Sequence, residues 1–265
     1  MTAGRGSGVR RLAGARRLMG ALRAPAERRY SGMSLTDLAR EFGSDKWGVH
    51  RYTPHYERHF AHLRDRQMTV LELGIGGYAR DQQGGASLRM WKWFFPRADV
   101  VGVDIEDKSF VDEERITSYV GSQTDRGLMR RIVKRHGAPN IVIDDGSHRP
   151  PDVRKSFRTL FPLLADDGIY VIEDIQTSYW PQWKGSLDLD DPTTSMAMVK
   201  RLLDGLNHEE FLDDTYEASY TDLHVTGVHC YHNLVFIEKG SNQEGSNKRE
   251  TNKQWYARRA AAPAD

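Results

Sequence analysis

Cysteine is almost absent from this sequence of 265 residues, which contains only Cys230. A single cysteine excludes an intramolecular disulfide, a cysteine-rich zinc site and an iron–sulfur cluster, and it fits a reducing, cytoplasmic setting. No stretch approaches the roughly 20 apolar residues that a membrane-spanning helix requires. Charge of one sign is not in excess either, because 38 Lys and Arg against 37 Asp and Glu leave a formal net charge of +1. The overall charge therefore gives no reason to expect binding to nucleic acid or to a membrane.

Acidic residues are nearly missing from the first 30 residues, where eight arginines stand against Glu27 alone. Apolar residues there are too sparse for a secretory signal, although an arginine-rich, acid-poor leader is also typical of an organellar transit peptide. We interpret residues 1–32 as a basic, disordered extension, with Met33 as a second candidate start of translation. Residues 240–265 are rich in polar residues and are interpreted as a polar tail. The folded domain is expected over residues 33–239.

Short apolar runs alternate with segments whose apolar residues recur at helical spacing. Four runs are predicted to be buried strands, at residues 69–73, 100–103, 140–143 and 169–172. The helical segments between them cover residues 88–95, 128–136 and 153–164. This order predicts an α/β fold with an open, mostly parallel sheet. Two later runs, at 224–228 and 234–238, predict a hairpin that adds an antiparallel edge.

A glycine-rich turn follows the first predicted strand, at Gly74-Ile75-Gly76-Gly77. Its glycines permit a tight turn and the close approach of a ligand, although an ordinary strand-to-helix turn uses the same residues. Asp104 ends the second strand, where an acid can accept hydrogen bonds from both ribose hydroxyls or simply cap a helix. The third glycine of the NAD fingerprint is missing, which favours S-adenosylmethionine over NAD.

Pairs of carboxylates follow two further strands: Asp144 and Asp145 in one motif, Glu173 and Asp174 in the other. The carboxyl ends of parallel strands share one edge of the sheet, and acids crowded there repel one another unless a cation or a proton holds them. Oxygen ligands select a hard ion such as Mg²⁺. Helix capping is the alternative, but it explains one acid per helix and not two adjacent pairs.

His148 lies three residues after Asp145, close enough to share its loop. A histidine in this place can be a general base, a metal ligand or a partner in a loop hydrogen bond. The residues alone leave these three roles open.

The motifs resemble those of a known family. The stretches that carry the resemblance are LELGIGGY at 71–78, GGASLRMWK at 84–92, VDI at 103–105, DDGSH at 144–148 and YVIEDIQTSYWP at 170–181. They are similar to the metal-dependent class I sugar O-methyltransferases of macrolide biosynthesis, over about residues 45–185, which is the catalytic domain only. The resemblance implies a Rossmann-like class I methyltransferase fold, whose mostly parallel seven-stranded sheet has an antiparallel edge hairpin. It also implies Mg²⁺-dependent methyl transfer from S-adenosylmethionine to a sugar hydroxyl of a glycosylated natural product.

Roles for individual residues follow from the resemblance alone. It implies that Asp145, Glu173 and Asp174 bind the metal and that His148 is the catalytic base. The positions that contact S-adenosylmethionine in the family correspond to Glu72, Gly74, Ser87, Asp104, Gln123 and Asp144.

Aromatic residues of the second acidic motif and just beyond it could stack on a sugar ring or pack as a hydrophobic lid: Tyr179, Trp180 and Trp183.

The expected partner is a small-molecule glycoside, with no membrane and no nucleic acid, and a homo-oligomer is left open. Two other function classes also stay open: an NAD-binding oxidoreductase with His148 as proton donor, and a non-catalytic binding module. A methyltransferase for another small-molecule acceptor or for a nucleic acid is a further alternative, the latter prompted only by the arginine-rich extension. The sequence does not name the acceptor, the hydroxyl or the pathway.

Overall fold

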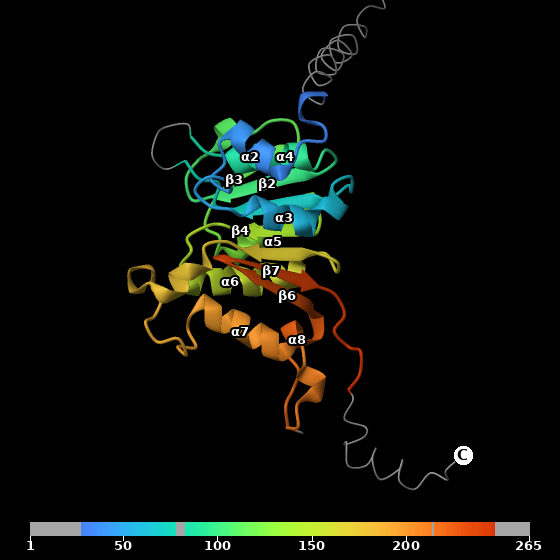
Figure 1. The fold of residues 1–265 in the computed structure, drawn as a ribbon, viewed down its shortest axis with the longest axis vertical. Coiled ribbons are helices and arrows are strands. Elements are labelled where there is room, and N and C mark those ends of the chain that lie inside the picture. The colour runs from blue at the N-terminus through green and yellow to red at the C-terminus, as the bar shows by residue number, and fades with distance from the viewer. Residues whose placement is uncertain (1–27, 78–82, 214, 247–265) are drawn as a thin grey trace, which may run out of the picture. The chain divides into compact units, whose positions relative to one another are not determined.

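The computed structural model describes residues 28–77, 83–213 and 215–246 (Figure 1). Its strands form a seven-stranded mixed sheet in the order β3-β2-β1-β4-β5-β7-β6. The strands are β1 Thr69–Leu73, β2 Asp99–Asp104, β3 Ile116–Val120, β4 Ile141–Asp144, β5 Ile169–Ile172, β6 Val225–Tyr231 and β7 Leu234–Lys239. The predicted α/β fold with an antiparallel edge hairpin is confirmed.

Helices fill the connections of this sheet. The α-helices are α2 Leu35–Phe42, α3 Thr53–Phe60, α4 Ala86–Phe94, α5 Arg126–His136, α6 Pro150–Leu160, α7 Ser195–Gly205 and α8 Tyr220–His224. Shorter 3₁₀ helices include η4 Ile175–Tyr179 and η5 Pro181–Trp183, which follow β5. The predicted helices begin two or three residues late because their first turns are polar or contain proline. Pro150 and Pro151, for example, open α6, where proline lacks only an N–H that would have no helical partner.

The three central strands end level with one another. In the parallel register of β1, β4 and β5, Leu73 pairs with Asp144, and Asp144 pairs with Ile172. The ladder continues one step further, since the Asp145 N–H donates to the Leu73 carbonyl at 2.9 Å and the Glu173 N–H to the Asp144 carbonyl at 3.0 Å. Every residue of these strands is buried, as expected for a parallel sheet covered on both faces.

The chain divides into two compact units. The first comprises the described residues up to 68 together with 75–102 and 108–118, and the second comprises 69–74, 103–107 and the described residues from 119 onward. In the first unit α2 and α4 lie side by side (Figure 1), and Tyr56 packs edge-on against Trp91 with ring centroids 4.9 Å apart. In the second unit the Phe157 ring of α6 packs edge-on against Tyr170 of β5 at 5.1 Å. Each unit thus has its own buried aromatic residues.

Two predictions on the strands were wrong. The strand β3 was not predicted, because its residues are only partly buried and lack a continuous apolar run. The first run of the hairpin was predicted to end at residue 228, but β6 continues through Cys230 and Tyr231. His232 and Asn233 alone form the turn, and Asn233 takes a positive φ of 65° that asparagine tolerates.

Parts of both predicted tails belong to the described structure. Residues 28–30 form a helical turn, and the Tyr30 ring lies 4.8 Å from Trp93 between ring centroids. At the other end, the Asn242 side chain donates to the Asp222 carbonyl at 2.8 Å and to the Leu206 carbonyl at 3.2 Å. The expectations for residues 1–27 and 247–265 lie outside the described residues. No helix in the described ranges is long and apolar enough to cross a membrane.

Candidate active site

Three carboxylates gather on one face of the sheet at the carboxyl end of the central strands. Side chains alternate between the two faces along a strand, so Glu72 points to the same side as the residues level with Gly74, which are Asp145 and Glu173. Carboxylate oxygens of Glu72, Asp145 and Glu173 all lie within 4.8 Å of one another. Glu72 is fully buried and Glu173 is 2% exposed.

A second group shares Asp145 with the first. Side-chain ligand atoms of Asp145, His148 and Asp174 also lie within 4.8 Å of one another. The Nε2 atom of His148 is 3.9 Å from Asp145 Oδ1 and 3.8 Å from Asp174 Oδ2. The structure therefore brings together the three residues predicted as metal ligands and the residue predicted as the base. It adds Glu72, which the sequence suggested only as a cofactor contact.

This donor set fits a divalent cation. Four carboxylates that lie this close together and partly or fully buried repel one another unless a cation or proton is present. Two ligands on opposite sides of Mg²⁺ are about 4.2 Å apart, so oxygens within 4.8 Å of one another need only small movements to share an ion. Oxygen donors favour Mg²⁺ over Zn²⁺.

Backbone strain is concentrated at the same place. His148 and Asp174 have positive φ values of 54° and 51°, which are uncommon for residues other than glycine and cost of order 1–3 kcal/mol each. Both are held by one side chain, because the Thr177 hydroxyl is 2.6 Å from the His148 carbonyl and 3.1 Å from the Asp174 carbonyl. Thr177 is a supporting residue that the sequence analysis missed.

A buried hydrogen-bond network holds the loop that carries these groups. Asp144 points to the opposite face of the sheet, where the Tyr170 hydroxyl donates to its Oδ2 at 2.9 Å. The Gln123 amide donates to Asp144 Oδ1 and to Ser156 Oγ, both at 2.9 Å, and its oxygen accepts the Ser147 N–H at 2.6 Å. Burial raises the pKa of Asp144 to about 6, even though the hydrogen bond from Tyr170 acts to lower it.

Two glycines are required where backbone segments meet at this loop. A Cβ on Gly74 would lie 2.2 Å from the Asp145 carbonyl oxygen, and Gly74 also has a positive φ of 78°. A Cβ on Gly146 would lie 2.2 Å from Oε1 of Gln123. A larger residue at Gly74 would displace the backbone at Asp145 and Gly146, and one at Gly146 would displace the Gln123 side chain from its hydrogen bonds.

Comparison with curated proteins gives close matches. The chain is 50% identical over 214 residues to demethylmacrocin O-methyltransferase of Streptomyces fradiae and 47% identical over 214 residues to mycinamicin VI 2''-O-methyltransferase of Micromonospora griseorubida. Each match covers 80% of this chain and 54% of the relative, so the chain spans about half the length of the curated relatives it matches. No protein-family model matches the chain.

Solved structures agree with this result. The MycE methyltransferase from the mycinamycin biosynthetic pathway, in complex with Mg and SAH, matches with a TM-score of 0.81 and 43% identity. The match covers 87% of this chain and 60% of that one. A complex of MycE with Mg, SAH and mycinamycin VI matches equally well, with a TM-score of 0.81 and 42% identity over 88% of this chain.

The chain is a homologue of these O-methyltransferases. Its sheet and helices have the class I methyltransferase fold that the resemblance implied. The proteins reported above are all methyltransferases, and no oxidoreductase is among them.

The positions predicted to contact the methyl donor lie at strand ends, in the turn after β3 and in α4. In the second unit, the Gly74 N–H donates to the Val103 carbonyl at 2.8 Å. The next residue, Asp104, is buried, and its Oδ1 accepts the Glu106 N–H at 3.0 Å. Ser87 lies buried in the first turn of α4 in the first unit. Gln123 and Asp144 make their hydrogen bonds to other protein groups, as described above.

Three partly exposed aromatic side chains follow the second acidic motif, and one of them, Trp183, lies beside His148. Tyr179, Trp180 and Trp183 are each about two-fifths exposed, at 39%, 41% and 38%. The Trp183 ring centroid is 6.1 Å from that of His148. An aromatic face beside a candidate base could bind the apolar face of a sugar ring, and these side chains are too exposed to be a fully packed lid.

Proposed function

We propose that the protein is a Mg²⁺-dependent O-methyltransferase that methylates a sugar hydroxyl of a glycosylated, macrolide-like natural product with S-adenosylmethionine as donor. The observation that carries the proposal is the carboxylate and histidine cluster at the carboxyl ends of β1, β4 and β5. It lies in a chain with 44–50% identity to curated O-methyltransferases. The proposal includes a small-molecule glycoside as partner and a cytoplasmic location, which the single cysteine supports.

Asp145, Glu173 and Asp174 would hold the cation, and Glu72 lies close enough to be a fourth ligand. A bound divalent cation orients substrate oxygens and lowers the pKa of a hydroxyl that it contacts. The Mg in the MycE complexes supports this assignment. The strained backbone at His148 and Asp174, fixed by Thr177, would keep the ligand side chains in place before substrate arrives.

His148 would act as the general base. S-adenosylmethionine supplies a methyl group on a positively charged sulfur, so the chain itself must position a hydroxyl oxygen and remove its proton. The Nε2 atom of His148 lies 3.9 Å from Asp145 Oδ1 and 3.8 Å from Asp174 Oδ2, which puts the ring beside the proposed cation site. A well-placed general base contributes roughly 10²–10⁴-fold to the rate.

S-adenosylmethionine would bind to the residues that the sequence analysis predicted as cofactor contacts. Asp104 would accept hydrogen bonds from the ribose hydroxyls, and Gly74 would allow the donor to approach the backbone. Glu72, Ser87, Gln123 and Asp144 complete the proposed set. For Gln123 and Asp144, the buried network also supports a role in holding the loop that carries Asp145 and His148.

Calorimetric titration tests the donor class. We expect the full chain to bind S-adenosylmethionine and not NAD. The chain should then convert S-adenosylmethionine and one or more members of a glycoside panel to methylated glycoside, detected by mass spectrometry. Binding of NAD in place of S-adenosylmethionine would revive the oxidoreductase alternative. Affinity for nucleic acid that falls steeply with salt would instead point to a nucleic-acid acceptor.

A further inference from the structure

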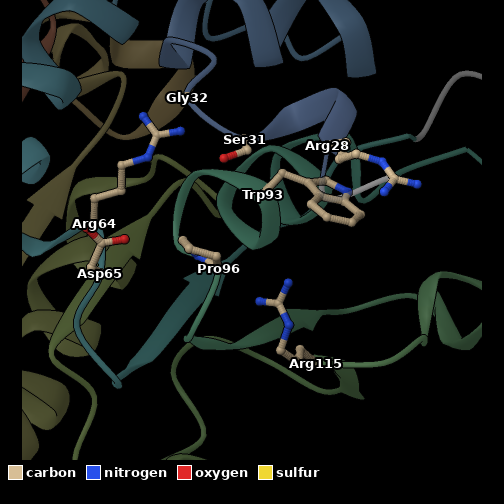
Figure 2. A pocket seen from close by; sticks show the side chains of 8 residues that line it. All are labelled: Arg28, Ser31, Gly32, Arg64, Asp65, Trp93, Pro96 and Arg115. Carbon is tan, nitrogen blue, oxygen red and sulfur yellow. The ribbon is translucent and has the colours of Figure 1, made fainter. Parts of the chain in front are cut away.

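A cavity of about 520 Å³ lies in the first unit, and the described residues that line it are all outside the carboxylate cluster (Figure 2). This volume is within the range of small-molecule sites. Four segments that are far apart in the sequence line it: the N-terminal turn, the segment before β1, the end of α4 and the residue before β3. The lining residues are Arg28, Ser31, Gly32, Arg64, Asp65, Trp93, Pro96 and Arg115.

Positive charge is in excess in this cavity, because three guanidinium groups face one carboxylate. Arg28 and Arg64 form no ion pair with any residue that the structure describes, and the Arg64 guanidinium lies over the Phe94 ring, 4.7 Å from its centroid. Like charges brought to one cavity repel each other, and an anion between them removes that repulsion. Arginine side chains also match carboxylates and phosphates through paired N–H donors.

Arg115 is already fixed in position. Its Nη1 donates to the carbonyls of Lys92, Phe95 and Ala98 at 3.1, 3.2 and 2.9 Å, which ties the guanidinium to the C-terminal end of α4. A group held in this way loses little conformational freedom when a ligand binds. The cavity thus has one immobilised cation, Arg115, and two cations, Arg28 and Arg64, that form no ion pair within the described ranges.

An apolar surface lies among the arginines. Trp93 and Pro96 are both partly exposed, and Figure 2 shows them between Arg64 and Arg28 with Arg115 nearby. An indole ring and a proline ring accommodate a flat apolar body. We propose that this cavity binds an organic anion in which a carboxylate or phosphate is attached to a flat, apolar body.

Calorimetry and thermal unfolding of the full chain test the proposal, with phenyl phosphate and benzoate as charged probes, inorganic phosphate as a probe without a ring, and benzyl alcohol as a neutral probe. We expect at least one ring-bearing anion to bind with millimolar or better affinity and to raise the Tm, and benzyl alcohol not to bind. A bound ligand would join the N-terminal turn to α4, so amide exchange at residues 28–32 should slow. The affinities of phenyl phosphate and benzoate, compared with each other, show whether the cavity prefers a phosphate or a carboxylate.

Two double variants that remove the same charge distinguish binding in the cavity from nonspecific attraction of anions to a positively charged surface. Arg28→Gln with Arg64→Gln should weaken binding at least tenfold. Arg126→Gln with Arg130→Gln, two exposed arginines of α5 in the second unit, removes the same charge and should leave affinity unchanged. Arg28→Gln alone, at an exposed position, should weaken binding even if the double variant folds poorly. Equal weakening by both pairs, unchanged affinity in the cavity variants, or no binding by any anion would overturn the proposal. None of these readouts involves methyl transfer, so a failure here leaves the proposed function untouched.

Discussion

His148 is the residue whose role decides between catalysis and metal binding. A hard ion prefers oxygen, and the histidine Nε2 lies 3.8–3.9 Å from two carboxylates that can themselves bind the ion. We predict that His148→Ala binds S-adenosylmethionine and Mg²⁺ with near-normal affinity and loses roughly 10²–10⁴-fold in kcat. Calorimetry and steady-state kinetics measure the two effects. If His148 were a ligand, the variant would need more Mg²⁺ and excess Mg²⁺ would restore its rate.

A second prediction for a single residue is that Asp144 makes the stability of the protein depend on pH. Its pKa rises from 3.8 to about 6 on folding, so the native state binds more protons than the unfolded state between these values. The stability of the metal-free protein should therefore contain a contribution that falls by about 3 kcal/mol as pH rises through this interval. Asp144→Asn should remove this contribution, which urea unfolding in EDTA at several pH values measures. An identical pH dependence in both proteins would show that Asp144 titrates normally.

At the scale of helices and strands, the sequence predicted most of what positions the site. The apolar runs of β1, β2, β4 and β5 are distinct because both faces of a parallel sheet are buried, and acids at their ends necessarily meet at one edge. The partners of Asp144 could not be predicted in the same way. Tyr170 and Gln123 reach it only through strand pairing and loop packing, which single-sequence periodicity does not record.

The junction of α7 and α8 supplies a prediction on stability. Asp222 is buried, which alone would raise its pKa, but hydrogen bonds from Tyr216 and Ser219 and the charge of Arg201 outweigh burial and lower it. Its stabilising contribution is present above the ordinary pKa and is lost as pH falls through the lowered one. We expect Asp222→Asn to cost about 1–3 kcal/mol at neutral pH in urea unfolding and to lose acid sensitivity.

An exposed aspartate provides the control for this variant. Asp190 pairs with Lys200 at 3.8 Å and its side chain is 96% exposed. Because such surface ion pairs contribute little, Asp190→Asn should change stability by about 0.5 kcal/mol or less. Equal effects of the two substitutions would contradict a special role for the buried carboxylate.

At the scale of the whole molecule, two compact units carry different chemistry. The acidic cluster and its supporting network belong to the second unit, whereas Ser87 and the arginine-lined cavity belong to the first. The homology to sugar O-methyltransferases covers 80% of the chain and about half of each relative. The central claim of the proposed function is that the clustered carboxylates bind a cation needed for methyl transfer.

The most direct test of this claim is the metal dependence of methyl transfer by the full chain, measured with S-adenosylmethionine and an accepted glycoside. EDTA should abolish turnover and Mg²⁺ should restore it. Asp145→Ala and Glu173→Ala should both be inactive at all Mg²⁺ concentrations while S-adenosylmethionine still binds by calorimetry. Full activity in EDTA, or in either variant, would contradict the account.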